Sequence, residues 1–218
     1  MTGEIRILLV DDHALVRGAL SERLQKEPRL VVVAGASTAD EAIEKTIEFS
    51  PDIILLDIDM PGLDCFEAAE RIKRLRPRTR IIFLSAYMYD HFIDQALSVK
   101  ASGYLTKRET PEKVVEAIIE VASGGAFFSE EVRSRIIVGS TGARLPAPWK
   151  SRAATLRLRE IETLRYISRG MTKKQIAAQM SISVKTVEHH TTNMMSKLGI
   201  HDRVALARFA IREGLAEP

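Results

Sequence analysis

The chain has 218 residues, of which 45% are hydrophobic and 28% charged, a composition typical of a soluble protein with one large domain or two small ones. No apolar run reaches the roughly 18 residues of a membrane span, and the N-terminus becomes acidic too early for a secretory signal. The single cysteine, Cys65, excludes an internal disulfide, so we expect a cytoplasmic protein with no membrane partner.

The formal net charge of +3 is unevenly distributed along the chain. Residues 1–125 carry 16 Lys and Arg against 21 Asp and Glu, whereas residues 126–218 carry 16 against 8. An acidic half followed by a basic half suggests two domains with different partners, and the basic half favours nucleic acid. A solvated basic surface without such a partner is the alternative.

The acidic half alternates short apolar runs with amphipathic stretches. The apolar runs predict five strands, at residues 5–10, 30–34, 53–57, 81–85 and 103–105. Helical periodicity predicts five helices between and after them, at residues 14–26, 39–49, 65–75, 90–100 and 111–123. Strands rich in Val, Ile and Leu without polar alternation are typical of a parallel sheet covered by helices on both faces. We therefore expect residues 1–125 to form a doubly wound, five-stranded parallel α/β domain.

The second half contains only helical signals after a linker. Gly124 and Gly125 end the last helix of the first half, and residues 126–152 are interpreted as a linker with room for a short helix at 129–138. Residues 153–218 are expected to form a small all-α domain. Its four predicted helices, bounded by capping residues, are 158–168, 173–180, 184–198 and 203–213.

Polar residues follow four of the predicted strands. Asp11 and Asp12 end the first strand, Asp57 the third and Ser85 the fourth, and Lys107 follows the fifth. The carboxyl ends of parallel strands share one edge of a doubly wound sheet, where ligands bind, so these side chains should converge. Each residue taken alone is more typical of a loop in contact with solvent. The presence of such residues at four strand ends favours a binding or catalytic site.

Clustered carboxylates predict a hard divalent cation, and Mg²⁺ prefers oxygen ligands. We expect Asp12 and Asp57 to bind Mg²⁺ directly, together with the backbone carbonyl of Asp59. Asp11 would act through a bound water molecule.

The same cluster predicts phosphoryl chemistry at Asp57. Mg²⁺ would screen this carboxylate from an incoming phosphoryl group, so that Asp57 acts as the nucleophile and phosphoacceptor. The equatorial phosphoryl oxygens need positive or donor partners, and we assign them to Mg²⁺, Lys107 and the hydroxyl of Ser85.

The helices predicted at 173–180 and 184–198 have the spacing of a helix-turn-helix, whose second helix enters the major groove of DNA. Helical phase places Val187, Thr191, Met194 and Leu198 on the core side. The residues expected to contact DNA are Thr172, Lys173, Lys174, Lys185, Thr186, Glu188, His189, Thr192 and Lys197.

Different DNA contacts are expected of different side chains. Lys185 and Lys197 are placed for phosphates, and Glu188 for the amino group of a cytosine. A small helical bundle with a solvated polar face is the alternative interpretation. A metal site at His189 and His190 is disfavoured, because adjacent histidines point in different directions on a helix.

Four segments make residues 1–125 resemble a response-regulator receiver domain. They are VDDH at 10–13, LLDIDMPG at 55–62, LSA at 84–86 and GYLTK at 103–107. The resemblance implies a flavodoxin/CheY-like fold and phosphorylation of Asp57 by a sensor histidine kinase. It also implies that Ser85 and Tyr104 shift together as a switch.

Residues 156–203 resemble a LuxR-type DNA-binding domain, through Glu160, Gly170, Thr186-Val187, His190 and Lys197-Leu198-Gly199 among other positions. The whole chain therefore resembles a NarL/FixJ-type response regulator. Such a protein is expected to be a phosphorylation-switched, sequence-specific transcription factor that binds double-stranded promoter DNA as a homodimer. It would not be an enzyme with external turnover, although its receiver would catalyse its own phosphoryl transfer and slow autodephosphorylation.

The sequence is compatible with two alternative functions. One is a DNA-binding regulator that does not depend on phosphate. The other is a phosphatase of the haloacid-dehalogenase type, because Asp57-Ile58-Asp59 is a D-x-D. In such phosphatases the nucleophile ends the first strand and the acidic pair comes last, whereas here the acidic pair comes first, so the phosphatase is disfavoured.

Overall fold

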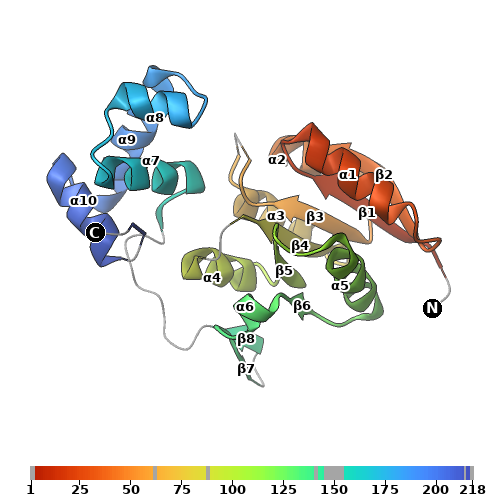
Figure 1. Cartoon of the computed structure of the whole chain (residues 1–218). Coiled ribbons are helices and arrows are strands. Elements are labelled where there is room, and N and C mark those ends of the chain that lie inside the picture. Colours follow the sequence, from red (N-terminus) through yellow and green to blue (C-terminus); the bar gives the residue numbers. More distant parts are fainter. Residues whose placement is uncertain are drawn as a thin grey trace. The chain divides into compact units, whose positions relative to one another are not determined.

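The computed structural model describes residues 3–60, 63–86, 89–139, 142–144, 155–213 and 215–216. The chain forms two compact units, Met1–Pro148 and Trp149–Pro218, and each is described by itself (Figure 1). None of the described helices is both long and apolar enough to cross a membrane.

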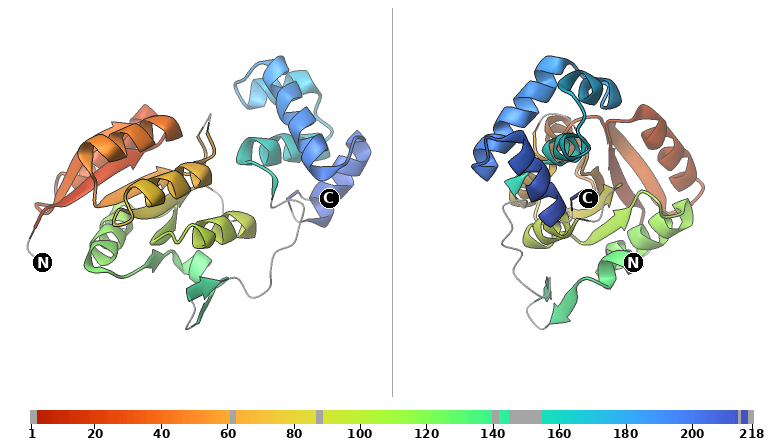
Figure 2. Two further views of the ribbon diagram at one scale, coloured as in Figure 1. Left: turned by 180° about the vertical axis from the view of Figure 1, so that it is seen from behind. Right: turned by 60° about the vertical axis from the view of Figure 1, so that its left-hand side comes forward.

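The first unit is a parallel sheet between two layers of helices (Figures 1 and 2). The strands have the spatial order β2-β1-β3-β4-β5-β6. Their bounds are β1 Ile5–Val10, β2 Leu30–Ala36, β3 Ile53–Asp57, β4 Arg80–Ser85, β5 Gly103–Thr106 and β6 Phe127–Phe128. The helices are α1 Ala14–Leu24, α2 Ala39–Phe49, α3 Cys65–Leu75, α4 Asp90–Ser98 and α5 Pro111–Ser123. The predicted doubly wound parallel fold is confirmed.

Both faces of the sheet are buried, as the unbroken apolar strands require. On one face Ile7, Leu9 and Leu55 belong to an apolar cluster that includes Val114 and Ile118 of α5. Alternate strand residues, such as Leu8 and Leu56, point to the other face and are fully buried as well. The burial of both faces therefore fixes the positions of the residues at the carboxyl ends of these strands.

The predicted count of five strands is wrong by one. A sixth strand, β6, pairs parallel with β5 through Gly103 opposite Phe127 and Tyr104 opposite Phe128. This strand is too short to produce an apolar run that the sequence pattern could reveal. The pairing depends on Gly103, because a Cβ there would lie 2.6 Å from the carbonyl oxygen of Phe127.

The segment predicted as a linker contains further short elements. After β6 come α6 Glu130–Arg133, β7 Ile137–Gly139 and β8 Gly142–Arg144, and the last two form an antiparallel pair. Val132 of α6 is fully buried. The rest of the predicted linker up to residue 152, including Trp149, lies outside the described residues.

The second unit consists of four helices, α7 Leu158–Ser168, α8 Lys173–Gln179, α9 Val184–Leu198 and α10 Arg203–Arg212. The four predicted helices are confirmed to within one residue at each end. Thr172, Ser183 and Asp202 cap the last three by accepting hydrogen bonds from backbone N–H groups, and these hydroxyl and carboxylate caps explain where the helices begin.

Candidate functional site

Three charged side chains meet at the carboxyl end of the sheet in the first unit. The ammonium of Lys107, which follows β5, lies 2.8 Å from Oδ2 of Asp11 and 2.7 Å from Oδ2 of Asp57. Asp11 follows β1 and is 2% exposed, and Asp57 ends β3 and is fully buried. The parallel topology thus brings together residues that are up to 96 positions apart in the chain.

Local hydrogen bonds orient the two carboxylates. Oδ1 of Asp11 accepts a hydrogen bond from the N–H of His13 at 2.8 Å, and Oδ1 of Asp57 accepts one from the N–H of Asp59 at 3.1 Å. In each loop one oxygen is held by the backbone two residues further on, as in an Asx turn. The other oxygen of each carboxylate is left for Lys107.

The pocket carries an excess of negative charge. Burial raises the pKa of Asp57 above its usual value, although the ammonium of Lys107 opposes this shift. Burial acts to lower the pKa of Lys107, but the charges and hydrogen bonds of Asp57 and Asp11 prevail and raise it. One positive charge, on Lys107, therefore faces two buried carboxylates, and a further cation would stabilise the pocket.

A fourth side chain, Asp12, lies beside the imidazole of His13. Its Oδ1 atom is buried without a hydrogen-bond partner, although Nδ1 of His13 lies 2.7 Å away. One ligand atom from each of Asp11, Asp12, His13 and Asp57 lies within 4.8 Å of the others. Three carboxylates this close together fit a hard divalent cation. Sequence reasoning missed His13, whose only signal was its place directly after the acidic pair.

Ser85 and Tyr104 lie on the neighbouring strands β4 and β5 and are 1% and 0% exposed. Burial raises the pKa of the Tyr104 phenol above its ordinary range, and a side-chain hydrogen bond with Ser85 acts in the opposite direction. The N–H of Lys107 donates to the carbonyl of Ser85 at 2.7 Å. The end of β4 is therefore tied both to the loop that carries Lys107 and to the tyrosine behind it.

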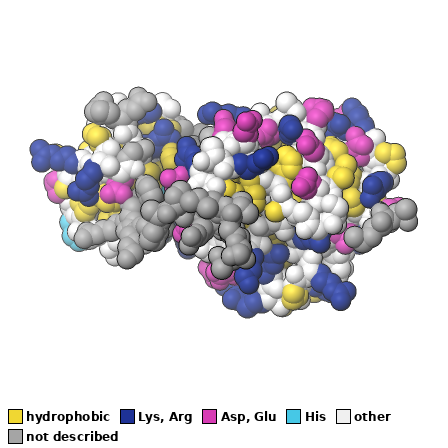
Figure 3. Space-filling model, turned by 90° about the horizontal axis from the view of Figure 1, so that it is seen from below, with side chains coloured by type: hydrophobic (Ala, Val, Ile, Leu, Met, Phe, Trp, Pro, Cys, Tyr) yellow, Lys and Arg dark blue, Asp and Glu magenta, His cyan; other side chains and the backbone are white. Residues whose placement is uncertain are grey.

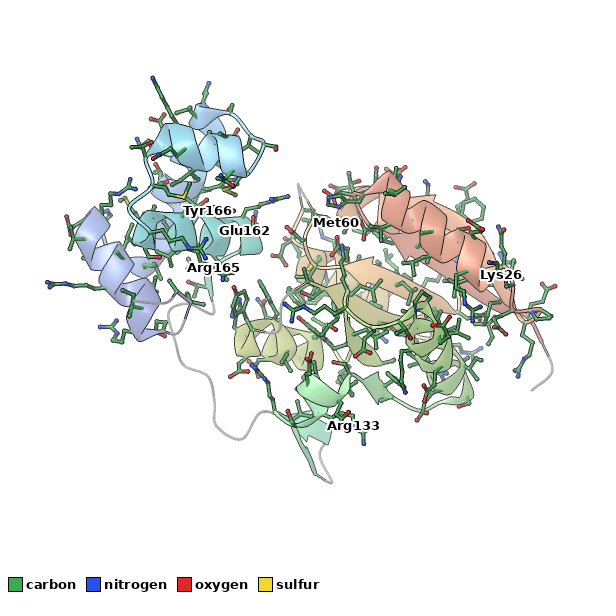
Figure 4. All side chains as sticks on the ribbon, in the orientation of Figure 1. Lys26, Met60, Arg133, Glu162, Arg165 and Tyr166 are labelled. Atoms are coloured by element: carbon green, nitrogen blue, oxygen red, sulfur yellow. The ribbon has the colours of Figure 1, made fainter. Side chains whose placement is uncertain are left out.

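The loop after β3 carries Asp59 and Met60, which are both half-buried. Met60 is labelled in Figure 4 and marks this loop at the carboxyl end of the sheet. The face seen in Figure 3 carries side chains of both charges among hydrophobic ones.

In the second unit, α9 presents one buried and one exposed face. Val187 and Met194 are fully buried and Leu198 is 1% exposed, as the helical phase predicted, whereas Thr191 is half-buried. Of the predicted contact residues, Thr186 is half-buried. The others are exposed, and they are Thr172, Lys173, Lys174, Lys185, Glu188, His189, Thr192 and Lys197. The predicted polar face of α9 is therefore exposed to solvent.

Two of these lysines have partners within the unit. The ammonium of Lys173 lies 2.9 Å from Oε1 of Glu188, and that of Lys197 lies 2.8 Å from Oε2 of Glu160. Glu160 is nearly buried, and its Oε2 also accepts a hydrogen bond from the N–H of Arg157 at 2.8 Å. The exposed Lys197 thus packs its ammonium against a nearly buried carboxylate of its own unit, which the sequence did not reveal.

Two protein-family models match the chain. The response regulator receiver domain matches residues 7–119, and the luxR family of bacterial regulatory proteins matches residues 154–210. Among curated proteins, the transcriptional regulatory protein LiaR of Bacillus subtilis is 33% identical over 97% of this chain and 99% of its own. The response regulator UvrY of Escherichia coli is 33% identical over 97% of this chain and 95% of its own.

Solved structures show the same architecture. A two-component response regulator of the LuxR family from Aurantimonas sp. has a TM-score of 0.58 and 32% identity over 61% of this chain and 94% of its own. RcsB from Salmonella enterica serovar Typhimurium is similar in fold, with a TM-score of 0.56 and 23% identity over 94% of this chain and 98% of its own.

The fold and the two sites define a regulator that joins an acidic α/β domain to a helix-turn-helix domain. The chain belongs to the two-component response regulators with a receiver domain and a LuxR-type DNA-binding domain. Members of this family are transcriptional regulators rather than typical enzymes, which argues against the phosphatase alternative.

Proposed function

We propose that phosphorylation of Asp57 by a sensor histidine kinase switches this protein as a sequence-specific transcription factor. The observation that supports the proposal is the contact of one ammonium, on Lys107, with two buried carboxylates, together with the carboxylate of Asp12 in the same cluster. This arrangement has the charge and the donors that a phosphoryl group and a divalent cation need.

The residues around Asp57 divide the chemistry among them. Asp12, Asp57 and the carbonyl of Asp59 would hold Mg²⁺ directly, with Asp11 bound through water, and the ion would neutralise charge on the phosphoryl group. A carboxylate oxygen of Asp57 forms the bond to phosphorus while the bond from phosphorus to the donor's nitrogen breaks, and the bonding pair stays on that nitrogen.

Lys107 and Ser85 would complete the transfer. The ammonium of Lys107 now contacts Asp57, so it can follow the negative charge onto a phosphoryl oxygen, and the hydroxyl of Ser85 donates to another. The same residues would admit water for slow autodephosphorylation. Tyr104, buried behind Ser85, would move with it and carry the change into β5.

The second unit would read DNA through α9. Exposed Lys185 is placed for a phosphate, and Glu188, His189 and Thr192 for base edges, with Thr172, Lys173, Lys174, Thr186 and Lys197 at the margins. The related RcsB was solved bound to the promoter rprA in the presence of the phosphomimetic BeF3−. We infer that this chain likewise binds promoter DNA, as a homodimer on a two-fold symmetric site.

The test is phosphorylation with a small phosphodonor and Mg²⁺, followed by DNA binding. We expect label on the wild-type chain, none on Asp57→Ala, and tighter binding of selected DNA only when the label is present. The matched control is Asp52→Asn, an exposed aspartate just before β3 at the opposite end of that strand, which should be labelled normally. Labelling of Asp57→Ala would exclude the assigned acceptor, and unchanged DNA affinity would favour a phosphate-independent regulator.

The DNA-facing lysines can be tested by salt dependence. Removal of a phosphate contact by Lys185→Ala should weaken binding to every sequence and flatten the logarithmic salt slope by about one unit. Lys197→Ala is a poorer test, because it also leaves the nearly buried carboxylate of Glu160 without its ammonium partner. An unchanged slope for Lys185→Ala would exclude its phosphate role.

A further inference from the structure

An ion pair links the two helices of the helix-turn-helix on its outer surface. Lys173 is the first residue of α8 and Glu188 lies in the second turn of α9, yet Nζ of Lys173 is 2.9 Å from Oε1 of Glu188. Both side chains remain about half exposed, at 50% and 51%. The pair therefore lies beside the face of α9 that would contact DNA.

Helix stability does not explain the lysine. The positive end of the helix dipole is at the N-terminus, where acidic side chains are favoured and lysine is not. The first turn of α8 nevertheless contains Lys173 and Lys174 and no acidic residue. A half-exposed ion pair contributes little to folding, because solvent screens it and two flexible side chains must be ordered. The pair is thus better explained by a ligand than by the fold.

Glu188 presents the complementary problem. A carboxylate on a groove-facing helix is repelled by the phosphates of DNA. It contributes favourably to binding only where a base offers it a hydrogen-bond donor. The exocyclic amino group of cytosine is that donor in the major groove. Since Lys173 lies on Oε1, the second oxygen of Glu188 accepts no hydrogen bond from the described residues and is available to a base.

We propose that Lys173 is a positioning residue that makes Glu188 selective for cytosine, an inference that rests on the proposed DNA-binding function. Lys173 holds Oε1 and offsets the negative charge, while Oε2 accepts a hydrogen bond from N4 of a cytosine. An ammonium has three donors, so Lys173 can also bind the neighbouring phosphate. This arrangement links the position of the DNA backbone to the recognition of one base pair.

The adjacent lysine provides a matched control. Lys174 is exposed on the same turn of α8, and no ion pair joins it to another described residue. The experiment compares Lys173→Met and Lys174→Met in the full phosphorylated chain, selecting bound sequences from random duplex DNA and then competing duplexes that differ at the selected cytosine. Both variants should lose about one unit of salt slope, because each loses one cation near the backbone.

Only Lys173→Met should also lose base preference. We expect discrimination for the cytosine to fall by about tenfold in Lys173→Met and in Glu188→Gln, with no further fall in the double variant. Lys173→Arg should retain much of it. Equal base preferences in Lys173→Met, Lys174→Met and the wild type would overturn the inference, and so would a cytosine preference that survives Glu188→Gln. Failure of the wild-type chain to bind DNA would instead overturn the proposed function on which the inference rests.

Thermal unfolding separates positioning from a structural role. A bridge that only stabilised the unit would lower the melting temperature of Lys173→Met and leave its base preference intact, and this outcome would overturn the proposal. Unchanged melting together with an altered preference supports it.

Discussion

His91, near the start of α4, is a buried imidazole without a hydrogen-bond partner for Nε2. It is 2% exposed, and its ring lies 4.0 Å from that of Phe92 and 5.7 Å from that of Tyr89 between centroids. Burial among aromatic rings disfavours the charged form, and this lowers the pKa of His91 from 6.5 to about 4, with Asp90 opposing the shift.

This histidine should make the first unit sensitive to acid. As the pH falls from 6.5 towards 4, the unfolded chain binds a proton at His91 and the folded chain does not. The free energy of unfolding should therefore fall by about 3 kcal/mol across this window, and this part of the pH dependence should vanish in His91→Phe. Denaturant titrations at several pH values measure it. Thr38→Ser, which keeps the hydroxyl cap of α2 and changes no ionisable group, is the control and should keep the full dependence.

Lys197 should contribute to stability as well as to DNA binding. Its removal leaves the nearly buried carboxylate of Glu160 without the ammonium at 2.8 Å, so Lys197→Met should destabilise the second unit by about 2 kcal/mol. Adding Glu160→Gln should recover most of the loss, because a neutral amide can still accept from the N–H of Arg157. Urea unfolding measures both, with exposed Lys185→Met as a control within about 0.5 kcal/mol of the wild type. Equal losses for the two lysine variants would refute the packing role.

For single residues, the sequence predicted the contacts that follow from the order of the strands alone. Asp11, Asp57 and Lys107 meet because parallel strand ends share an edge, and that rule needs only the order of the strands. The pair of Lys197 with Glu160 joins residues 37 positions apart on two helices, and no local spacing predicts how those helices pack. His91 was missed because nothing in a single sequence distinguishes a buried histidine from an exposed one.

Among the elements, β6 depends on a close approach that only glycine permits. A methyl group at position 103 would lie 2.6 Å from the carbonyl oxygen of Phe127 and 3.2 Å from Cγ2 of Ile82. Gly103→Ala should therefore displace β6 and destabilise the first unit by about 2 kcal/mol. Hydrogen exchange at the N–H groups of Phe127 and Ser129, which donate to Ser102 and Tyr104, should accelerate.

A second strand glycine provides the control for this prediction. Gly35 lies in β2, where an added Cβ would meet its nearest atoms at an ordinary 3.8 Å, so Gly35→Ala should leave the exchange of these amides unchanged. Unaltered exchange in Gly103→Ala would mean that β6 does not depend on the close approach.

The elements with strong periodicity were predicted well, since the unbroken apolar strands and the capped helices each carry a local signal. The segment after α5 was not. Its short elements are stabilised by long-range contacts such as the pairing of β6 with β5 and the burial of Val132 in α6, and neither produces a pattern in the sequence.

The whole molecule consists of two compact units, and a ligand of the first unit should stabilise that unit through its own contacts. We expect two unfolding transitions in calorimetry. Mg²⁺ at ten times its dissociation constant should stabilise only the first unit, by about 1.4 kcal/mol. Asp12→Asn, which removes one carboxylate of the cluster, should abolish this shift while both transitions persist. A single transition that moves as a whole with Mg²⁺ would contradict independent units.

Cys65 gives this chain an internal reporter. It is the only thiol in 218 residues, it begins α3 and is 4% exposed, and burial together with the nearby Asp64 and Asp57 raises its pKa well above the usual value. A thiol that is both covered and protonated reacts with an alkylating reagent only after the protein opens around it. The rate of modification therefore measures transient opening of the first unit in the intact chain. The second unit has no cysteine and does not contribute to this rate.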